Sequence, residues 1–214
     1  MRKFRLYNFI ANYRQVWLLF LLLSIVGIAG VYFRQQRRLR QEIELVESLA
    51  VVQRLIEEGE YEKALKGEEG IFSGLEEIVK SAKGFRVANL TYLYSGLVYM
   101  QKKDCASAIS YFLLFDLQST FLQASVLALI GDCYSKEGKY EAAIEYYEKA
   151  SACNPNPHLT PSYLIKAAQL YELQKKYLPA LSCYEKIVTM FPSSSSCKIA
   201  KKHVARLKML VDFT

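Results

Sequence analysis

Hydrophobic positions follow two patterns along the chain. From Val16 to Phe33, 18 consecutive residues carry no charge, and a helix of that length, rising about 1.5 Å per residue, covers roughly the 30 Å core of a bilayer. After residue 34 the apolar positions recur every three or four residues, which is the period of amphipathic helices. The pattern predicts an all-α chain with a basic amino-terminal tail over 1–15, a single transmembrane helix over 16–33 and a helical domain after them.

A cleavable signal peptide is the alternative to this membrane helix, because Gly27 and Ala29 are small residues that support cleavage after Ala29. The apolar run is longer than a usual signal core. Export is disfavoured by four arginines that would begin the mature chain: Arg34, Arg37, Arg38 and Arg40. We therefore expect a retained anchor that contacts the lipid bilayer through residues 16–33. Its orientation stays open, because four Arg or Lys side chains lie on each side.

The chain after residue 88 repeats itself with offsets of 35 and 37 residues. Four columns match, in the order small residue, Tyr, Ala and aromatic: Gly96, Gly131 and Ala168; Tyr99, Tyr134 and Tyr171; Ala108, Ala143 and Ala180; Phe112, Tyr147 and Tyr184. A small residue allows two antiparallel helices to approach closely. We expect the first aromatic to fill the gap between them, and the later Ala and aromatic to pack against the next repeat. Each unit is thus predicted to be a helix hairpin, with the middle turn at 136–139.

This spacing resembles the tetratricopeptide repeat (TPR), with copies at 89–122, 124–157 and 161–194. Within 34–88 we expect a linker helix and a degenerate first repeat, in which Gly59, Tyr61 and Ala64 echo Gly138, Tyr140 and Ala143, followed by a Gly-broken loop over 66–76. Residues 195–214 are predicted to form a charged capping helix. The expected fold is therefore a transmembrane helix followed by a TPR solenoid with a carboxy-terminal cap.

Charge argues against nucleic acid as a partner. The net charge is +7, but eight of the 28 Lys and Arg side chains lie in residues 1–40, where there is no acid. The remaining 20 face 21 acidic side chains, so the helical domain has no cationic excess of the kind that a nucleic-acid surface needs.

The sequence offers no constellation for chemistry. Its two histidines, His158 and His203, have no Cys, Asp or Glu at metal or triad spacing. The five cysteines form no CxxC pair and are expected to be packed thiols whose pairing stays open: Cys105, Cys133, Cys153, Cys183 and Cys197. No glycine motif suits a phosphate. We therefore expect no catalytic residue, no metal, no cofactor, no small-molecule substrate and no enzyme.

Binding of other proteins is the class of function that these exclusions leave. In such solenoids the first helix of each hairpin lines a concave groove. By register, the candidate partner-binding residues are Leu90, Leu93, Leu97, Met100, Asp132, Gln169 and Glu172. The alternative for the apolar stripe over 90–100 is packing against the upstream helix at 43–58. A receptor for chaperone tails is disfavoured, because the groove lacks the Lys and Asn that grip a terminal carboxylate.

The anchor, the segment KALKGEEGIFSGLEEI and the repeats after it together resemble the YfgM-like bacterial family. The resemblance implies a single-pass inner-membrane protein with its amino terminus in the cytoplasm and its repeats in the periplasm. It also implies an ancillary, chaperone-like role beside the Sec translocon, with translocon subunits, chaperones or exported polypeptides as partners. The alternative function is a structural scaffold subunit of an envelope or secretion assembly.

Overall fold

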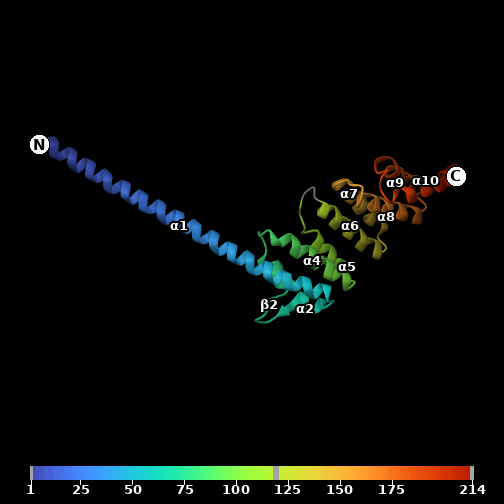
Figure 1. The fold of residues 1–214 in the computed structure, drawn as a ribbon, viewed down its shortest axis with the longest axis horizontal. Coiled ribbons are helices and arrows are strands. Elements are labelled where there is room, and N and C mark those ends of the chain that lie inside the picture. Colours follow the sequence, from blue (N-terminus) through green and yellow to red (C-terminus); the bar gives the residue numbers. More distant parts are fainter. Residues whose placement is uncertain (1, 118–120, 213–214) are drawn as a thin grey trace. The chain divides into compact units, whose positions relative to one another are not determined.

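The computed structural model describes residues 2–117 and 121–212, with side chains described from residue 20 to residue 211 outside 118–120. Helices dominate this part of the chain (Figure 1). In chain order they are α1 (Arg2–Glu57), α2 (Tyr61–Lys66), α3 (Leu75–Ser81), α4 (Val87–Gln101), α5 (Cys105–Phe112), α6 (Phe121–Lys136), α7 (Tyr140–Cys153), α8 (Thr160–Leu173), α9 (Tyr177–Met190) and α10 (Cys197–Asp212). The fold is an all-α helical solenoid, as expected, apart from one small hairpin.

Residues 1–47 and 48–214 form two compact units. The first unit is the longer part of α1, and its large apolar side chains from Phe20 to Phe33 are exposed. Among the described side chains, no helix combines the length and the apolar character needed to cross a membrane. The described side chains begin at residue 20. The basic tail predicted over 1–15 and the first four residues of the transmembrane helix predicted over 16–33 therefore lie outside them.

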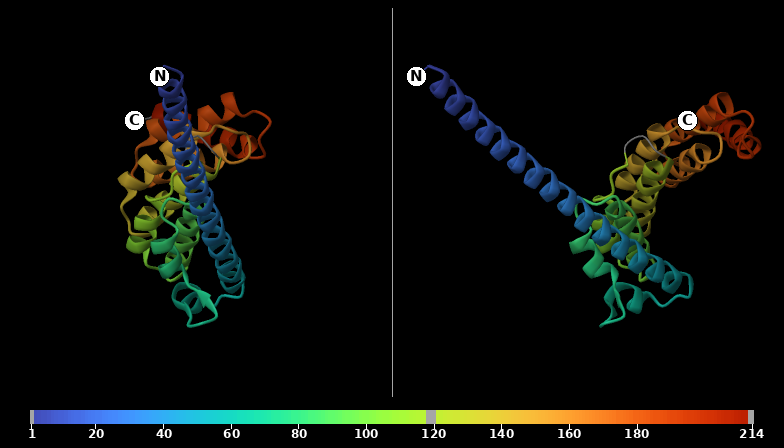
Figure 2. Two further views of the ribbon diagram at one scale, coloured as in Figure 1. Left: turned by 90° about the vertical axis from the view of Figure 1, so that its left-hand side faces the viewer. Right: turned by 60° about the vertical axis from the view of Figure 1, so that its left-hand side comes forward.

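The second unit contains three consecutive helix pairs, which we call the first, second and third full repeats: α4 with α5, α6 with α7, and α8 with α9. Each helix from α4 to α9 packs against the next one, and α10 packs against α9 (Figure 2). The predicted turn of the second full repeat is confirmed, because α6 ends at Lys136 and α7 begins at Tyr140. Gly138 lies between them with a φ of +74°.

In the first and second full repeats, the small residue lies directly under an aromatic ring. A Cβ added to Gly96 would lie 2.3 Å from Phe112 Cε1, and one added to Gly131 would lie 2.7 Å from Tyr147 Cε1. We expected the first tyrosine of each repeat to fill this gap, and that was wrong. In these two repeats the first tyrosine stacks instead on another tyrosine of its own hairpin, with ring centroids 5.4 Å apart for Tyr99 and Tyr111 and 5.5 Å apart for Tyr134 and Tyr146.

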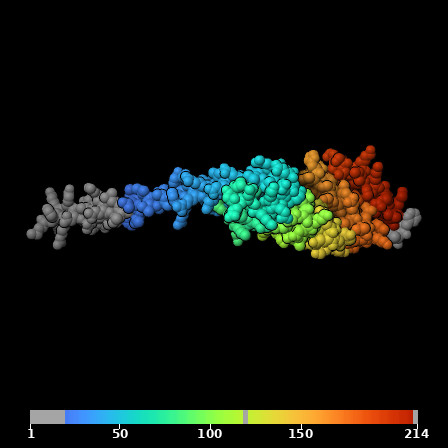
Figure 3. Space-filling view, turned by 90° about the horizontal axis from the view of Figure 1, so that it is seen from below, coloured from blue at the N-terminus to red at the C-terminus, as the bar shows by residue number. Residues whose placement is uncertain are grey.

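The segment between α2 and α3 was predicted to be a loop, and the structure corrects this. Two short antiparallel strands, β1 (Gly67–Glu68) and β2 (Phe72–Ser73), pair there in the register Gly67 to Ser73 and Glu68 to Phe72. The backbones of Gly67 and Gly74 are so close that a Cβ on Gly67 would lie 2.3 Å from the Gly74 nitrogen. Glycine therefore closes this hairpin, which belongs to the turquoise part of the chain in Figure 3.

The second helix of the first full repeat is short. α5 ends at Phe112, whereas α7 and α9 each have 14 residues. The chain that leaves α5 is fixed by Asn89 of α4, whose amide donates a hydrogen bond to the Asp116 carbonyl and accepts one from the Asp116 amide, both at 2.9 Å. One side chain thus takes over the backbone bonds that a longer helix would make.

Candidate partner-binding face

The seven predicted partner-binding residues lie on α4, α6 and α8, and we call the surface formed by the outward sides of these helices the first-helix face. Leu90 is its most exposed apolar member on α4, at 41%. Leu93, Leu97 and Met100 are half-buried. These three pack against a cluster built by α5 and α6 and the chain between them, here called the α5–α6 cluster: Cys105, Ala108, Ile109, Phe112, Phe115, Val126, Ile130 and Cys133. Of the apolar stripe, Leu90 is thus the side chain most free to meet a partner.

Asp132 on α6 is occupied by bonds within the chain. It accepts a hydrogen bond from the Tyr147 hydroxyl at 2.6 Å and two from Lys166 Nζ, at 2.6 and 2.9 Å. Tyr147 belongs to α7 of the same repeat and Lys166 to α8 of the next. Burial, together with the hydrogen bond to Asp132 and its charge, raises the pKa of Tyr147 well above its ordinary value. The phenol therefore stays a hydrogen-bond donor at any physiological pH.

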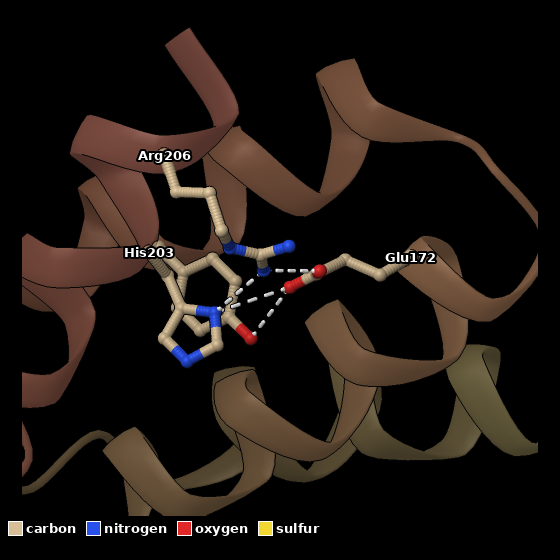
Figure 4. A network of polar contacts seen from close by, with 4 residues as sticks. Glu172, His203 and Arg206 are labelled. Carbon is tan, nitrogen blue, oxygen red and sulfur yellow. Dashed lines mark hydrogen bonds and ion pairs between the residues drawn. The ribbon is translucent and has the colours of Figure 1, made fainter. Parts of the chain in front are cut away.

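Glu172 on α8 is the centre of a second such network (Figure 4). It accepts a hydrogen bond from the Tyr184 hydroxyl of α9 at 3.0 Å and another from Arg206 of α10. His203 of α10 brings its Nδ1 to 3.3 Å from the same carboxylate, and its ring stacks on Tyr184 with centroids 4.5 Å apart. Burial alone would raise the pKa of Glu172, but the bonds from Arg206 and Tyr184, with the nearby positive charges, hold this pKa below its ordinary value.

The two networks have the same arrangement of side chains, and we call each of them a tyrosine–acid–cation network. The aromatic of the fourth matched column donates its hydroxyl to an acid on the first helix of its own repeat. A cation from the next first helix, or from the cap, binds the same acid: Tyr147 with Asp132 and Lys166, and Tyr184 with Glu172 and Arg206. Buried tyrosine hydroxyls usually require such a partner. Asp132 therefore joins the second repeat to the third, and Glu172 joins the third repeat to the cap helix α10.

The first full repeat lacks this design. Its fourth-column aromatic is Phe112, which has no hydroxyl, and Leu97 and Met100 stand where the later repeats have Asp132 and Glu172. The first-helix face is consequently apolar on α4 and carries internally bonded acids on α6 and α8. Gln169 on α8 is exposed, so it and Leu90 are the two predicted residues best placed to meet a partner.

Sequence reasoning found the acids but missed their partners. Lys166 and Arg206 had no assigned role, and His203 was noted only as lacking an acidic partner at metal or triad spacing, whereas it contacts Glu172. The available signal was the tyrosine column itself, because a buried hydroxyl requires an acceptor, here an acid on the paired helix.

The remaining reactive side chains form no further site. In the described part of the chain, no group of three or more His, Cys, Asp or Glu side chains is arranged to hold a metal ion. His158 is exposed. All five cysteines are free thiols, and only Cys153 is not buried.

Comparison with known proteins agrees with the fold. Residues 122–193, which contain α6 to α9, match the tetratricopeptide repeat family. The chain is 30% identical over 118 residues to the uncharacterized protein ycf37 of Cyanophora paradoxa. That match covers 53% of this chain and 64% of the relative, so the chain spans just under two thirds of the relative's length.

Two solved structures share the architecture at low sequence identity. A tetratricopeptide repeat protein from Parabacteroides merdae superimposes with a TM-score of 0.61 at 14% identity, covering 79% of this chain and 62% of that one. MamA superimposes with a TM-score of 0.55 at 17% identity, covering 73% of this chain and 82% of that one. The chain therefore has a tetratricopeptide-like solenoid fold, with its match to the tetratricopeptide repeat family confined to residues 122–193.

Proposed function

We propose that this protein is a membrane-tethered interaction module that binds apolar segments of other polypeptides on the α4 end of the first-helix face. Tetratricopeptide repeats generally act as protein-binding scaffolds and not as enzymes. The observation that carries the proposal is the exposure of Leu90, at 41%, beside the half-buried Leu93, Leu97 and Met100. The acids farther along the same face already have partners within the chain.

The occupied acids also indicate the class of partner. Asp132 and Glu172 would have to give up their hydrogen bonds to Tyr147, Lys166, Tyr184 and Arg206 before they could bind a basic ligand. An apolar segment that covers Leu90 breaks none of these bonds and removes apolar surface from water. Gln169 is available to bind the backbone of an extended partner. Unfolded or newly exported polypeptides offer such segments.

The tether would be residues 16–33, in contact with lipid. The part with described side chains, 20–33, has no charge, and its large apolar side chains are exposed around the helix, with Ile28 at 70% and Phe20 at 65%. Arg37, four residues after Phe33, lies over the Phe33 ring, 4.6 Å from its centroid. A helix that is apolar all round needs an apolar environment, and an arginine at its end suits the headgroup boundary.

The place of action follows from the resemblance to the YfgM-like family. We infer an inner-membrane protein whose amino terminus lies in the cytoplasm and whose repeats lie in the periplasm, beside the Sec translocon. A carboxy-terminal reporter that is active only in the periplasm tests this orientation in cells. An inactive periplasmic reporter, together with activity of a second reporter that works only in the cytoplasm, would refute it.

Leu90→Glu in the full chain tests the binding surface. We expect capture of an unfolded, apolar model polypeptide to fall at least about tenfold, because the partner cannot desolvate a carboxylate. The melting temperature should stay unchanged, since Leu90 is exposed. Leu178→Glu on α9 is the matched control, because Leu178 is 65% exposed and lies off the first-helix face.

Unchanged capture by Leu90→Glu, or an equal loss with Leu178→Glu, would refute the proposed surface. A photocrosslinker at Leu90 in cells then separates two functions. Many transient partners support the handling of exported polypeptides, whereas one stoichiometric partner supports a scaffold subunit.

A further inference from the structure

Two of the five thiols lie together at the joint between the first and second full repeats. Cys105 is the first residue of α5 and Cys133 lies on α6, and both belong to the α5–α6 cluster. Their exposed fractions are 8% and 0%. Both side chains thus lie in the packed joint between α5 and α6. Burial, and after it the Cys105 side chain, raises the pKa of the Cys133 thiol.

The other three cysteines have different surroundings. Cys183 is buried in the cluster built by α6 to α10, and Cys153 packs against that same cluster. Burial, and after it the charge of Glu148, raises the pKa of the Cys183 thiol to about 11. Cys197 is buried at the start of α10. Cys105 and Cys133 thus stand out as a pair.

We propose that Cys105 and Cys133 form a reversible disulfide that crosslinks α5 to α6. The joint that it would close is the one without a tyrosine–acid–cation network, because Phe112 replaces the tyrosine there. A covalent bond would supply a fixed link at this joint, as Asp132 does between the second and third repeats through Tyr147 and Lys166. The proposal does not depend on the proposed function.

The oxidant is a small disulfide such as oxidised glutathione. The Cys105 thiolate, at the more exposed position, attacks one glutathione sulfur, forms a mixed disulfide and releases one glutathione thiolate. Cys133 then loses its proton and attacks Cys105 Sγ, which releases the second glutathione. Two protein thiols are oxidised and one glutathione disulfide is reduced to two thiols.

Burial makes the second step slow. It is the largest cause that raises the pKa of Cys133, to about 12, so only a small fraction is thiolate at neutral pH. The bond should therefore form over a long exposure to an oxidising compartment and persist there, since the same burial hinders attack by an external thiol.

Alkylation and mass spectrometry test the proposal on the full chain. After incubation with oxidised glutathione and alkylation of the remaining thiols, two of the five cysteines should be protected. A peptide that links Cys105 to Cys133 should be found in the monomer, and dithiothreitol should restore all five thiols. The crosslinked chain should also melt at a higher temperature than the reduced chain.

Three variants complete the test. Cys105→Ala and Cys133→Ala should lose the crosslink, whereas Cys183→Ala should keep it, since Cys183 is buried elsewhere. Circular dichroism checks that each variant keeps its helices. Glutathione adducts without a crosslink, a bond between another pair, or five reactive thiols after oxidation would each overturn the proposal.

Discussion

At the scale of single residues, Gly131 has the least room in the second full repeat. An added Cβ would lie 2.7 Å from the Tyr147 ring and 3.2 Å from the Ala143 carbonyl oxygen. The ring cannot move away freely, because its hydroxyl is held by Asp132 at 2.6 Å. Gly131→Ala should therefore lower the free energy of unfolding by about 1–3 kcal/mol, measured by urea denaturation.

Ala168 provides the matched control for this substitution. It occupies the same column in the third full repeat, where it is fully buried. Ala168→Gly removes a methyl group and should cost only about 1 kcal/mol, through helix propensity. An unchanged urea midpoint for Gly131→Ala would contradict the close approach of α6 and α7.

Glu172 makes stability depend on pH. Its folded pKa lies below the ordinary value of 4.5. Its stabilising contribution is therefore complete above pH 4.5 and is lost as the pH falls through the lowered folded pKa. Urea midpoints at neutral pH and at a pH below 4.5 measure this loss.

Glu172→Gln should show a smaller fall in midpoint between the two conditions than the wild-type chain, because glutamine does not titrate. Glu141→Gln is the control, since the Glu141 side chain is 77% exposed, and it should keep the wild-type profile. Equal falls in all three chains would show that Glu172 does not set the acid sensitivity.

The sequence predicted the buried positions within each repeat, but it did not predict the bonds between repeats. Gly131, Ala143 and Tyr147 are buried as the repeat spacing indicated, because column residues depend on local register. The bond between Asp132 and Lys166 joins side chains 34 positions apart in the sequence, and it depends on how one hairpin is rotated on the next. Sequence spacing does not determine that rotation.

At the scale of elements, the three hairpins turn in the same way. Lys103, Gly138 and Lys175 occupy equivalent turn positions, and each has a positive φ, of 64°, 74° and 60°. In all three, the amide of the next residue donates a hydrogen bond to the carbonyl of the second-column tyrosine at 2.8–2.9 Å. The sequence predicted this turn at Gly138 but gave no sign of it where lysine takes the glycine position.

Lysine is strained in this left-handed conformation, and glycine is not. Lys175→Gly should therefore raise the free energy of unfolding by about 0.5–1 kcal/mol. Lys176→Gly, at a neighbouring position with a φ of −87°, should lower it by a similar amount. Thermal melts compare the two, and a loss of stability in Lys175→Gly would contradict the argument.

The β1–β2 hairpin shows why short elements escape prediction. Each strand has two residues, which is too few for the alternation that identifies a strand. The glycines at 67, 70 and 74 signalled a break in the helix, and the pairing across them arises from the close approach of Gly67 to Gly74.

At the scale of the whole molecule, the chain divides near residue 48. The buried side chains of the second unit begin with Leu49 and Val52 and continue to Leu207 on the cap. We expect residues 41–214, produced alone, to fold as a helical monomer, because this part buries its own apolar faces. Circular dichroism and light scattering check this. A strand-dominated spectrum would contradict it.

The tyrosine–acid–cation networks make the later repeats thermodynamically interdependent. Each network crosses three helices, so no hairpin among them can open without breaking bonds that its neighbour also needs. Loss of α10 removes Arg206 and His203 from Glu172 and uncovers the Tyr184 ring. We therefore expect unfolding that begins at α10 to destabilise the third full repeat and then the second, because they share these bonds. The first full repeat is joined to the second through apolar contacts, so we expect it to melt separately from this cooperative block.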